Sequence, residues 1–361
     1  MPIIPLKCPS CGAQLQADSD SAILTCKYCG TNSVMKDAIV QNYIQNTVNI
    51  NAATVNVCSQ KDFVIRGGVL EKYCGESVDV VIPNNVTAIG RGAFNGLQIS
   101  SVVIPKSVRE IRDSAFSSCT ALTSVKIPNS VKKIGEAAFL ACTALTSISI
   151  PASIKKIDRS TFSGCSALKS IAIPDSVAVI DWSAFTNCTS LKSIVIPNGI
   201  TAIEVAVFEG CTALKSISMP DSVTKICFDA FNGCTALQSI IIPNSVTEIE
   251  HDAFTGCSAL TSITIPDGVN AICEGTFHGC TALKSVSFPN HKMYIREGSF
   301  SDCTSLTSVK GLSIDSHVYC DVIKKFLVEK RKQEGKCQHC GGSFKGIFKS
   351  ICSSCGKEKD Y

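Results

Sequence analysis

The sequence has little of what most enzymes and membrane proteins need. It contains five histidines in 361 residues, and none of them is paired with a plausible nucleophile, which argues against hydrolase chemistry. No apolar run approaches the roughly 18 to 20 residues of a membrane span. The first residues, MPIIPLKCPSCG, show no basic region followed by an apolar segment. We therefore expect no signal peptide, no membrane span and a cytoplasmic, reducing location.

Cysteine, in contrast, is abundant. In a secreted protein the 22 cysteines would predict a disulfide scaffold. Eight of them form Cys-x-x-Cys pairs, and nine recur at one fixed step along the chain. Nearly all of the cysteines therefore have an explanation that does not require oxidation.

The middle of the chain is a repeat with a period of 23 residues. Its motif is Ile-Pro-x-Ser-Val-x-x-Ile-x-x-x-Ala-Phe-x-x-Cys-x-x-Leu-x-Ser-Ile. The step separates nine phenylalanines from Phe116 to Phe300 and nine cysteines from Cys119 to Cys303. A fixed period of this size with Leu-x-x-Ile-x-Ile strands predicts a leucine-rich repeat solenoid. We expect about ten repeats of short parallel strands over residues 83–312.

Within one repeat, alternation predicts a short strand from Leu122 that ends at Pro128, because proline has no N–H for the ladder. Phe139 then closes the turn as one rung of an aromatic spine. The cysteine column could suggest redox or metal chemistry. We expect a buried packing role instead, since no neighbouring histidine or lysine would activate a thiolate.

Solenoids need ends that close their cores, and the sequence predicts one at each side. Residues 61–82 read as a capping hairpin that turns at Gly67 and Gly68. Residues 313–335 read as a capping helix; a free helix on a membrane surface is the alternative. One face of that helix is apolar: Val318, Val322, Ile323, Phe326 and Leu327.

Two clusters of cysteines flank the repeats, in residues 1–36 and 336–361. Each contains two Cys-x-x-Cys-Gly segments, which together supply four thiolates for a tetrahedral Zn²⁺ ion. Four protein ligands leave no open position, so each predicted zinc ribbon would be structural. The predicted ligands are Cys8, Cys11, Cys26 and Cys29 at the first site and Cys337, Cys340, Cys352 and Cys355 at the second.

The two predicted ribbons differ in charge. The first, which residues 37–60 connect to the repeats as a linker or strand, has no excess of basic residues. The second has Lys336, Lys345, Lys349, Lys357 and Lys359 interleaved with aromatic residues. Nucleic acid is therefore an alternative partner for the C-terminal ribbon.

One column of the repeat changes character in the middle of the array. It is the position two residues after the isoleucine of Val-x-x-Ile, and it carries mostly charged residues at both ends. Over four consecutive repeats it holds Trp182, Val205, Phe228 and His251 instead. Exposed aromatic clusters mark binding surfaces, so these four residues are candidates for partner binding. Packing of these side chains against the solenoid is the alternative.

The repeat resembles the BspA-type (type 5) leucine-rich repeats, which are abundant in gut and oral bacteria and in some parasitic protists. The resemblance covers about residues 78–311. It implies a solenoid used for adhesion or other protein binding, with no catalytic residues. Many relatives are exported, whereas this chain shows no signal and two apparent zinc ribbons. We therefore expect a non-enzymatic protein–protein interaction protein; a nucleic-acid adaptor and a cell-surface adhesin are the alternatives.

Overall fold

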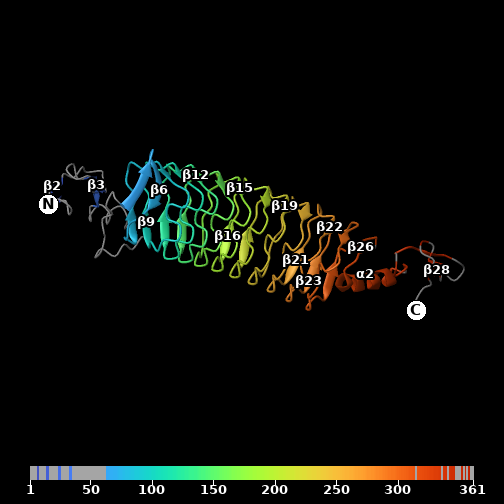
Figure 1. Cartoon of the computed structure of the whole chain (residues 1–361). Helices are drawn as coiled ribbons and strands as arrows, with labels where there is room; N and C mark the ends of the chain where they lie inside the picture. The colour runs from blue at the N-terminus through green and yellow to red at the C-terminus, as the bar shows by residue number, and fades with distance from the viewer. Residues whose placement is uncertain are drawn as a thin grey trace, which may run out of the picture.

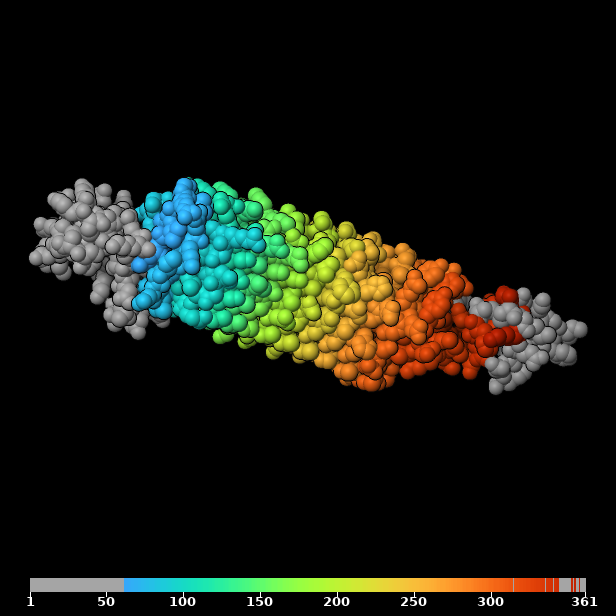
Figure 2. Space-filling view, in the orientation of Figure 1, coloured from blue at the N-terminus to red at the C-terminus, as the bar shows by residue number. Residues whose placement is uncertain are grey.

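The structure is a computed structural model, and it describes the repeat region almost without gaps. The described residues are 6–7, 14–15, 23–25, 32–34, 62–313, 315–334, 336–339, 341–345, 351–352, 354 and 357. Figure 1 shows the chain winding as a solenoid from residue 62 to a helix near the C-terminus. Figure 2 shows the same region as one elongated rod.

Successive turns contribute short parallel strands to two faces of the solenoid, which we call sheet 1 and sheet 2. On the sheet 1 face the turns at residues 170–172 and 239–241 have no strand, and the first of them makes only an isolated bridge between Ser149 and Ala172. Sheet 1 is built from three-residue strands along the lower side of Figure 1. These are β7 (Asp79–Val81), β9 (Ser101–Val103), β11 (Ser124–Lys126), β13 (Ser147–Ser149), β16 (Ser193–Val195), β18 (Ser216–Ser218), β21 (Ser262–Thr264), β23 (Ser285–Ser287) and β25 (Ser308–Lys310).

Sheet 2 lies across the core from sheet 1 and consists of two-residue strands next to the N-terminal hairpin. The hairpin is β5 (Phe63–Arg66) and β6 (Val69–Tyr73). The following strands are β8 (Ala88–Ile89), β10 (Glu110–Ile111), β12 (Lys133–Ile134), β14 (Lys156–Ile157), β15 (Val179–Ile180), β17 (Ala202–Ile203), β19 (Lys225–Ile226), β20 (Glu248–Ile249), β22 (Ala271–Ile272), β24 (Tyr294–Ile295) and β26 (His317–Val318).

The solenoid has about 11 turns with a period of about 23 residues, one turn more than the sequence predicts. The first turn is shorter: Phe94 and Phe116 stack although they are 22 residues apart, which breaks the 23-residue step. From there on, equivalent residues pair in register, as Ser124 does with Ser147.

The core is a stack of aromatic rings. From Phe94 to Phe300 the fully buried phenylalanines of successive turns stack with centroid separations of 4.9–5.8 Å. Tyr73 and Phe63 continue the stack at the N-terminal end. The predicted spine is confirmed, and each ring depends on both neighbours for its packing.

The buried cysteines form a second column beside the rings. Each thiol donates a hydrogen bond to the carbonyl of a spine phenylalanine in the preceding turn, as Cys211 Sγ does to Phe185 O at 3.2 Å. The turn just before each cysteine needs a left-handed residue. Gly210, with φ of 67°, adopts this conformation without strain, whereas Ala141 and Asn187 adopt it at the same position of other turns.

Different elements close the two ends. The β5–β6 hairpin turns at Gly67 and Gly68, which both have positive φ, and β6 pairs with β8 of the first turns. At the other end α2 (Asp321–Gln333) places Ile323 and Leu327 in the solenoid core. The helix therefore caps the array. It begins at Asp321, so the expectation that Val318 lies on its apolar face is wrong: Val318 pairs with Ile295 in sheet 2.

The flanking segments contain short antiparallel pairs. In the N-terminal part β1 (Leu6–Lys7) pairs with β2 (Gln14–Leu15), and β3 (Ile23–Thr25) pairs with β4 (Asn32–Val34). After the cap, β27 (Phe344–Lys345) pairs with β28 (Ile351–Cys352).

Candidate recognition surface

The four predicted partner-binding residues lie on consecutive turns, just beyond the ends of the sheet 2 strands. We call Trp182, Val205, Phe228 and His251 the recognition column. Backbone hydrogen bonds join it to the rest of the turn: the carbonyl of Trp182 accepts from Ser160 N at 3.0 Å, and the other three carbonyls accept in the same way. The column is therefore held in register by the solenoid itself.

Trp182 is the most firmly held aromatic residue of the column. Its side chain is 49% exposed. The indole Nε1 donates to Glu204 Oε2 of the next turn at 3.2 Å, and the backbone amide donates to Asp181 Oδ1 at 2.8 Å. Lys156 Nζ contacts Asp181 Oδ2 at 2.7 Å, beside a shallow hollow of about 340 Å³ that the indole borders. The ring is thus fixed at its polar edge while much of its surface faces solvent.

Phe228 is also accessible, with 43% of its surface exposed, whereas Val205 is half-buried and His251 is exposed. The backbone amide of Phe228 donates to Glu250 Oε2 at 2.9 Å. Phe228 and His251 border a second hollow of about 540 Å³. Neither Trp182 nor Phe228 belongs to the buried core, so both side chains are available for contact with a partner.

The surroundings of Phe228 are acidic. The carboxylates on this part of the surface are Glu204, Glu209, Asp229, Glu248, Glu250, Asp252 and Glu274. Among the described residues, Lys225 is the one cation that forms ion pairs with these carboxylates; it contacts Glu248 and Glu250 at 3.1 and 2.6 Å. Burial and the nearby charge of Asp252 raise the pKa of Asp229. Burial and Asp229 likewise raise the pKa of Glu209.

Two carboxylates next to the column, Asp181 and Glu250, have lowered pKa values instead. Partial burial alone would raise the pKa of Asp181, but hydrogen bonds from Lys156 and from the amide of Trp182 hold it below its usual value. Burial would also raise the pKa of Glu250, but hydrogen bonds from Lys225 and from the amide of Phe228 hold it below its usual value. These carboxylates stay ionised while they position the aromatic residues.

The thiols of the buried cysteine column have low reactivity. Burial raises the pKa of Cys119, Cys165, Cys211 and Cys303 to about 12. The thiolate is the reactive form, so these cysteines are poor nucleophiles and poor metal ligands at neutral pH.

Of the predicted zinc ligands, only Cys337 and Cys352 lie among the described residues; Cys8, Cys11, Cys26, Cys29, Cys340 and Cys355 lie outside them. Cys337 and Cys352 are both buried. Cys337 begins a tight turn in which Gly341 N donates to Cys337 O at 2.7 Å, and Ser354 N donates to Cys352 Sγ at 3.4 Å. An amide donor to sulfur suits a metal-bound thiolate. Within the described part of the chain, no group of three or more potential ligands could hold a metal ion.

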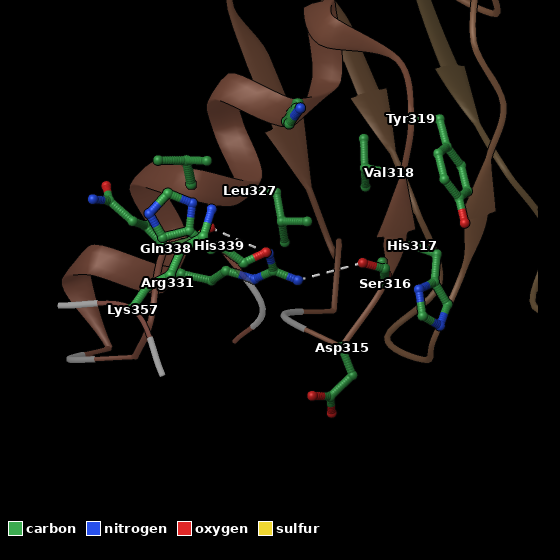
Figure 3. Close-up of a pocket in the computed structure, with 12 residues that line it drawn as sticks. Asp315, Ser316, His317, Val318, Tyr319, Leu327, Arg331, Gln338, His339 and Lys357 are labelled. Atoms are coloured by element: carbon green, nitrogen blue, oxygen red, sulfur yellow. Dashed lines mark hydrogen bonds between the residues drawn. The ribbon is translucent and has the colours of Figure 1, made fainter. Parts of the chain in front are cut away.

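The C-terminal segment is attached to the cap through a buried arginine. Arg331 of α2 donates to the carbonyls of Gln338 and His339 at 3.3 and 3.2 Å, and to Ser316 O at 3.4 Å. Figure 3 shows the side chain reaching between the solenoid and the turn that contains His339. This arginine fixes the position of the predicted Cys337 turn relative to the last repeat, and sequence reasoning missed it.

Sequence reasoning also missed a row of three lysines on sheet 1. Lys169, Lys192 and Lys215 are exposed and occupy one position of three consecutive turns. Because they are 23 residues apart, the repeat period alone predicts that they lie side by side. On the same face Val195 and Ile241, at 69% and 85% exposure, are the most exposed of the large apolar side chains among the described residues.

Comparison with known families decides how the repeats are classified. Residues 70–192 and 201–319 match the BspA type leucine rich repeat region. The chain belongs to this family. BspA-type proteins are typically non-enzymatic and bind other proteins, which suits an array with an exposed aromatic column. No match appears among curated proteins.

The chain is also similar to solved structures of leucine-rich repeat proteins. A leucine-rich repeat protein from Bacteroides ovatus is 29% identical, with a TM-score of 0.52, over 74% of this chain and 76% of that one. A leucine rich cell surface protein from Faecalibacterium prausnitzii is 26% identical over 71% of this chain and 95% of that one, with a TM-score of 0.36. A third, from Eubacterium ventriosum, is 22% identical over 69% and 79% of the two chains, with a TM-score of 0.47.

In the part of the chain that the structure describes, no helix has the length and apolar character that crossing a membrane requires.

Proposed function

We propose that this protein is a non-enzymatic recognition or scaffold protein that binds a protein partner through the recognition column. The observation that carries the proposal is the placement of Trp182 and Phe228: both are about half exposed on one rigid face where other turns carry charged residues. Large aromatic side chains that are held in place before binding contribute most to affinity, because little conformational freedom is lost.

The acidic surroundings specify the kind of partner. A protein segment with lysine or arginine beside an apolar anchor would complement Phe228 and the carboxylates around it. Burial is the main cause that raises the pKa values of Asp229 and Glu209, and the neighbouring carboxylates of Asp252 and Asp229 add to it. A cationic group of the partner would offset both effects.

We further propose that the flanking cysteine clusters are structural zinc ribbons. Cys8, Cys11, Cys26 and Cys29 would hold one ion, and Cys337, Cys340, Cys352 and Cys355 the other. In the sequence, each N-terminal Cys-x-x-Cys segment lies between the two strands of an antiparallel pair, β1–β2 or β3–β4. The buried Cys337 and Cys352 and the amide donor to Cys352 Sγ support the second site.

Different observations support the expected location and the two alternative functions. A reducing, cytoplasmic location suits zinc-bound thiolates and free buried cysteines. A cell-surface adhesin role is supported by the family, and it would use the same recognition column. A nucleic-acid adaptor role rests only on the basic residues from Lys336 to Lys359.

Replacing Trp182 and Phe228 together by alanine tests the main proposal. The variant should keep its fold, because both side chains lie at the surface, and it should lose the partner proteins that the native chain captures.

A further inference from the structure

The lysine row on sheet 1 is separate from the recognition column. Lys192 and Lys215 directly precede β16 and β18, and Lys169 holds the same position of the turn before them. The column lies beside sheet 2, across the core (Figure 1). Lys215 N donates to Lys192 O at 2.9 Å, and Lys192 N donates to Lys169 O at 3.2 Å. The three residues are therefore direct neighbours, at the spacing of about 4.7–4.9 Å between adjacent strands.

Nothing in the described structure neutralises this row. None of the ion pairs among the described residues includes Lys169, Lys192 or Lys215. On sheet 2, in contrast, Lys156 and Lys225 each contact two carboxylates. Stacked like charges are unfavourable for a sheet, so the lysine row costs stability in the free protein.

The surface next to the lysines carries hydroxyl groups. Ser170, Ser193 and Ser216 form an exposed row alongside them, and the residues two further on are Ala172, Val195 and Ser218. From β9 to β25 the described strands of sheet 1 contain no carboxylate and no aromatic residue. The face thus offers a repeating line of cations and a repeating line of hydroxyls.

We propose that this face binds a linear anionic polysaccharide, one that carries sulfate or carboxylate groups along its length. A ligand with regularly repeated charges matches cations that a solenoid repeats at a fixed spacing, and the serine hydroxyls can bond sugar hydroxyls. Single-stranded nucleic acid fits less well, because binding sites for it use aromatic side chains on which bases stack. A protein partner fits less well too, since the face lacks the aromatic and arginine anchors of protein interfaces.

The test uses the full chain and two triple variants that remove the same charge. In the first, Lys169→Thr, Lys192→Thr and Lys215→Thr introduce the residue that Thr123, Thr146 and Thr261 place at the same position of other turns. In the control, Lys106→Asn, Lys132→Thr and Lys155→Thr replace exposed lysines elsewhere, again with residues native to those columns. Thermal melts confirm that both fold.

Binding to immobilised heparin and alginate is measured over a range of salt concentrations, with dextran as the neutral reference. The native chain should bind both polyanions, and the lysine-row variant should bind roughly tenfold more weakly, since three exposed charge contacts of modest strength add to about that factor. The control triple variant and the Trp182/Phe228 double alanine variant should bind as the native chain does.

Three results would overturn the proposal. One is no binding of either polyanion by the native chain. A second is equal loss in both triple variants, which would indicate a response to net charge alone. The third is tighter binding of oligothymidylate, or of phosphatidylserine vesicles, than of either polysaccharide.

Discussion

The indole of Trp182 is hydrogen-bonded to the carboxylate of Glu204 on the following turn, with 3.2 Å between Nε1 and Oε2. This bond fixes the orientation of an aromatic ring that is half exposed. A ring held in one orientation loses less freedom when a partner binds than a mobile ring does. Glu204 is thus a positioning residue of the recognition column.

Removing that positioning should weaken binding without affecting folding. We expect Glu204→Ala to lower affinity for the captured partner by roughly three- to tenfold, because about 1 kcal/mol of ordering cost returns to the binding step. Glu204→Gln should remain close to native, since its amide oxygen can still accept from the indole. Interferometry with the purified partner separates the two variants, and equal affinities would contradict the positioning role.

The aromatic spine and the recognition column should respond to truncation in opposite ways. Phe139 is fully buried between Phe116 and Phe162, so Phe139→Ala should cost about 3–5 kcal/mol in the free energy of unfolding. Phe228→Ala removes an exposed ring and should change that energy by about 0.5 kcal/mol or less. Urea unfolding followed by circular dichroism measures both, and a large loss for Phe228→Ala would mean that its ring is part of the packing.

The acidic surface should show a pH dependence of stability. Because the pKa of Asp229 is raised on folding, its ionised form opposes the folded state; this cost is fully present above the raised pKa and vanishes below the ordinary pKa of aspartate, near 3.8. Asp229→Asn should therefore be more stable than native at pH 7, by up to about 0.5 kcal/mol. The gain should disappear as the pH falls towards 3.5.

Asp181 supplies the opposite case as a control. Its pKa is lowered on folding, so its contribution is present above the ordinary pKa of aspartate and is lost as the pH falls through the lowered value. Asp181→Asn should thus be less stable than native at pH 7. Unfolding curves at pH 7 and pH 3.5 compare the two variants; the same sign of change at pH 7 in both would contradict this assignment of charges.

The zinc proposal predicts two ions per chain after purification under reducing conditions. Cys337→Ser and Cys352→Ser should each reduce that number to one, whereas Cys211→Ser in the buried column should leave it at two. Chelation should leave the solenoid folded, because its stability comes from packing between neighbouring turns. Elemental analysis together with circular dichroism provides the check, and a native chain without zinc would rule the sites out.

The repeat carried most of the structural prediction because every turn obeys the same packing rule. The 23-residue step located the spine, the cysteine column and the proline-terminated strands, and the glycine pair located the N-terminal turn at Gly67 and Gly68. The prediction fell one turn short at the C-terminal end: residues 83–312 hold ten strands of sheet 2, from β8 to β24, and the eleventh, β26, lies beyond them. It also extended the helix to Val318, since an apolar residue fits the pattern of a helix or of a short strand equally well.

The candidate site was harder to predict for a physical reason. Periodicity shows which residues share a column, but the exposure of a column depends on where the two-residue strands of sheet 2 end. Trp182 and Phe228 could therefore be aligned from the sequence, while their exposure and the bond from Trp182 to Glu204 required the structure. Arg331 left no periodic signal, because it lies in the capping helix after the repeats and two of its carbonyl partners, Gln338 and His339, lie beyond that helix.

The central claim is that the recognition column binds a protein, and quantitative affinity enrichment tests it most directly. The native chain, Trp182→Ala/Phe228→Ala and Tyr319→Ala are immobilised, and each captures proteins from a lysate of the native organism. Tyr319 is exposed outside the column, which makes its variant the matched control. We predict partners that the native chain and the control retain and the double variant loses, with melting temperatures that agree within about 2 °C. Identical captured sets for all three proteins, or a double variant that melts well below the native chain, would contradict the account.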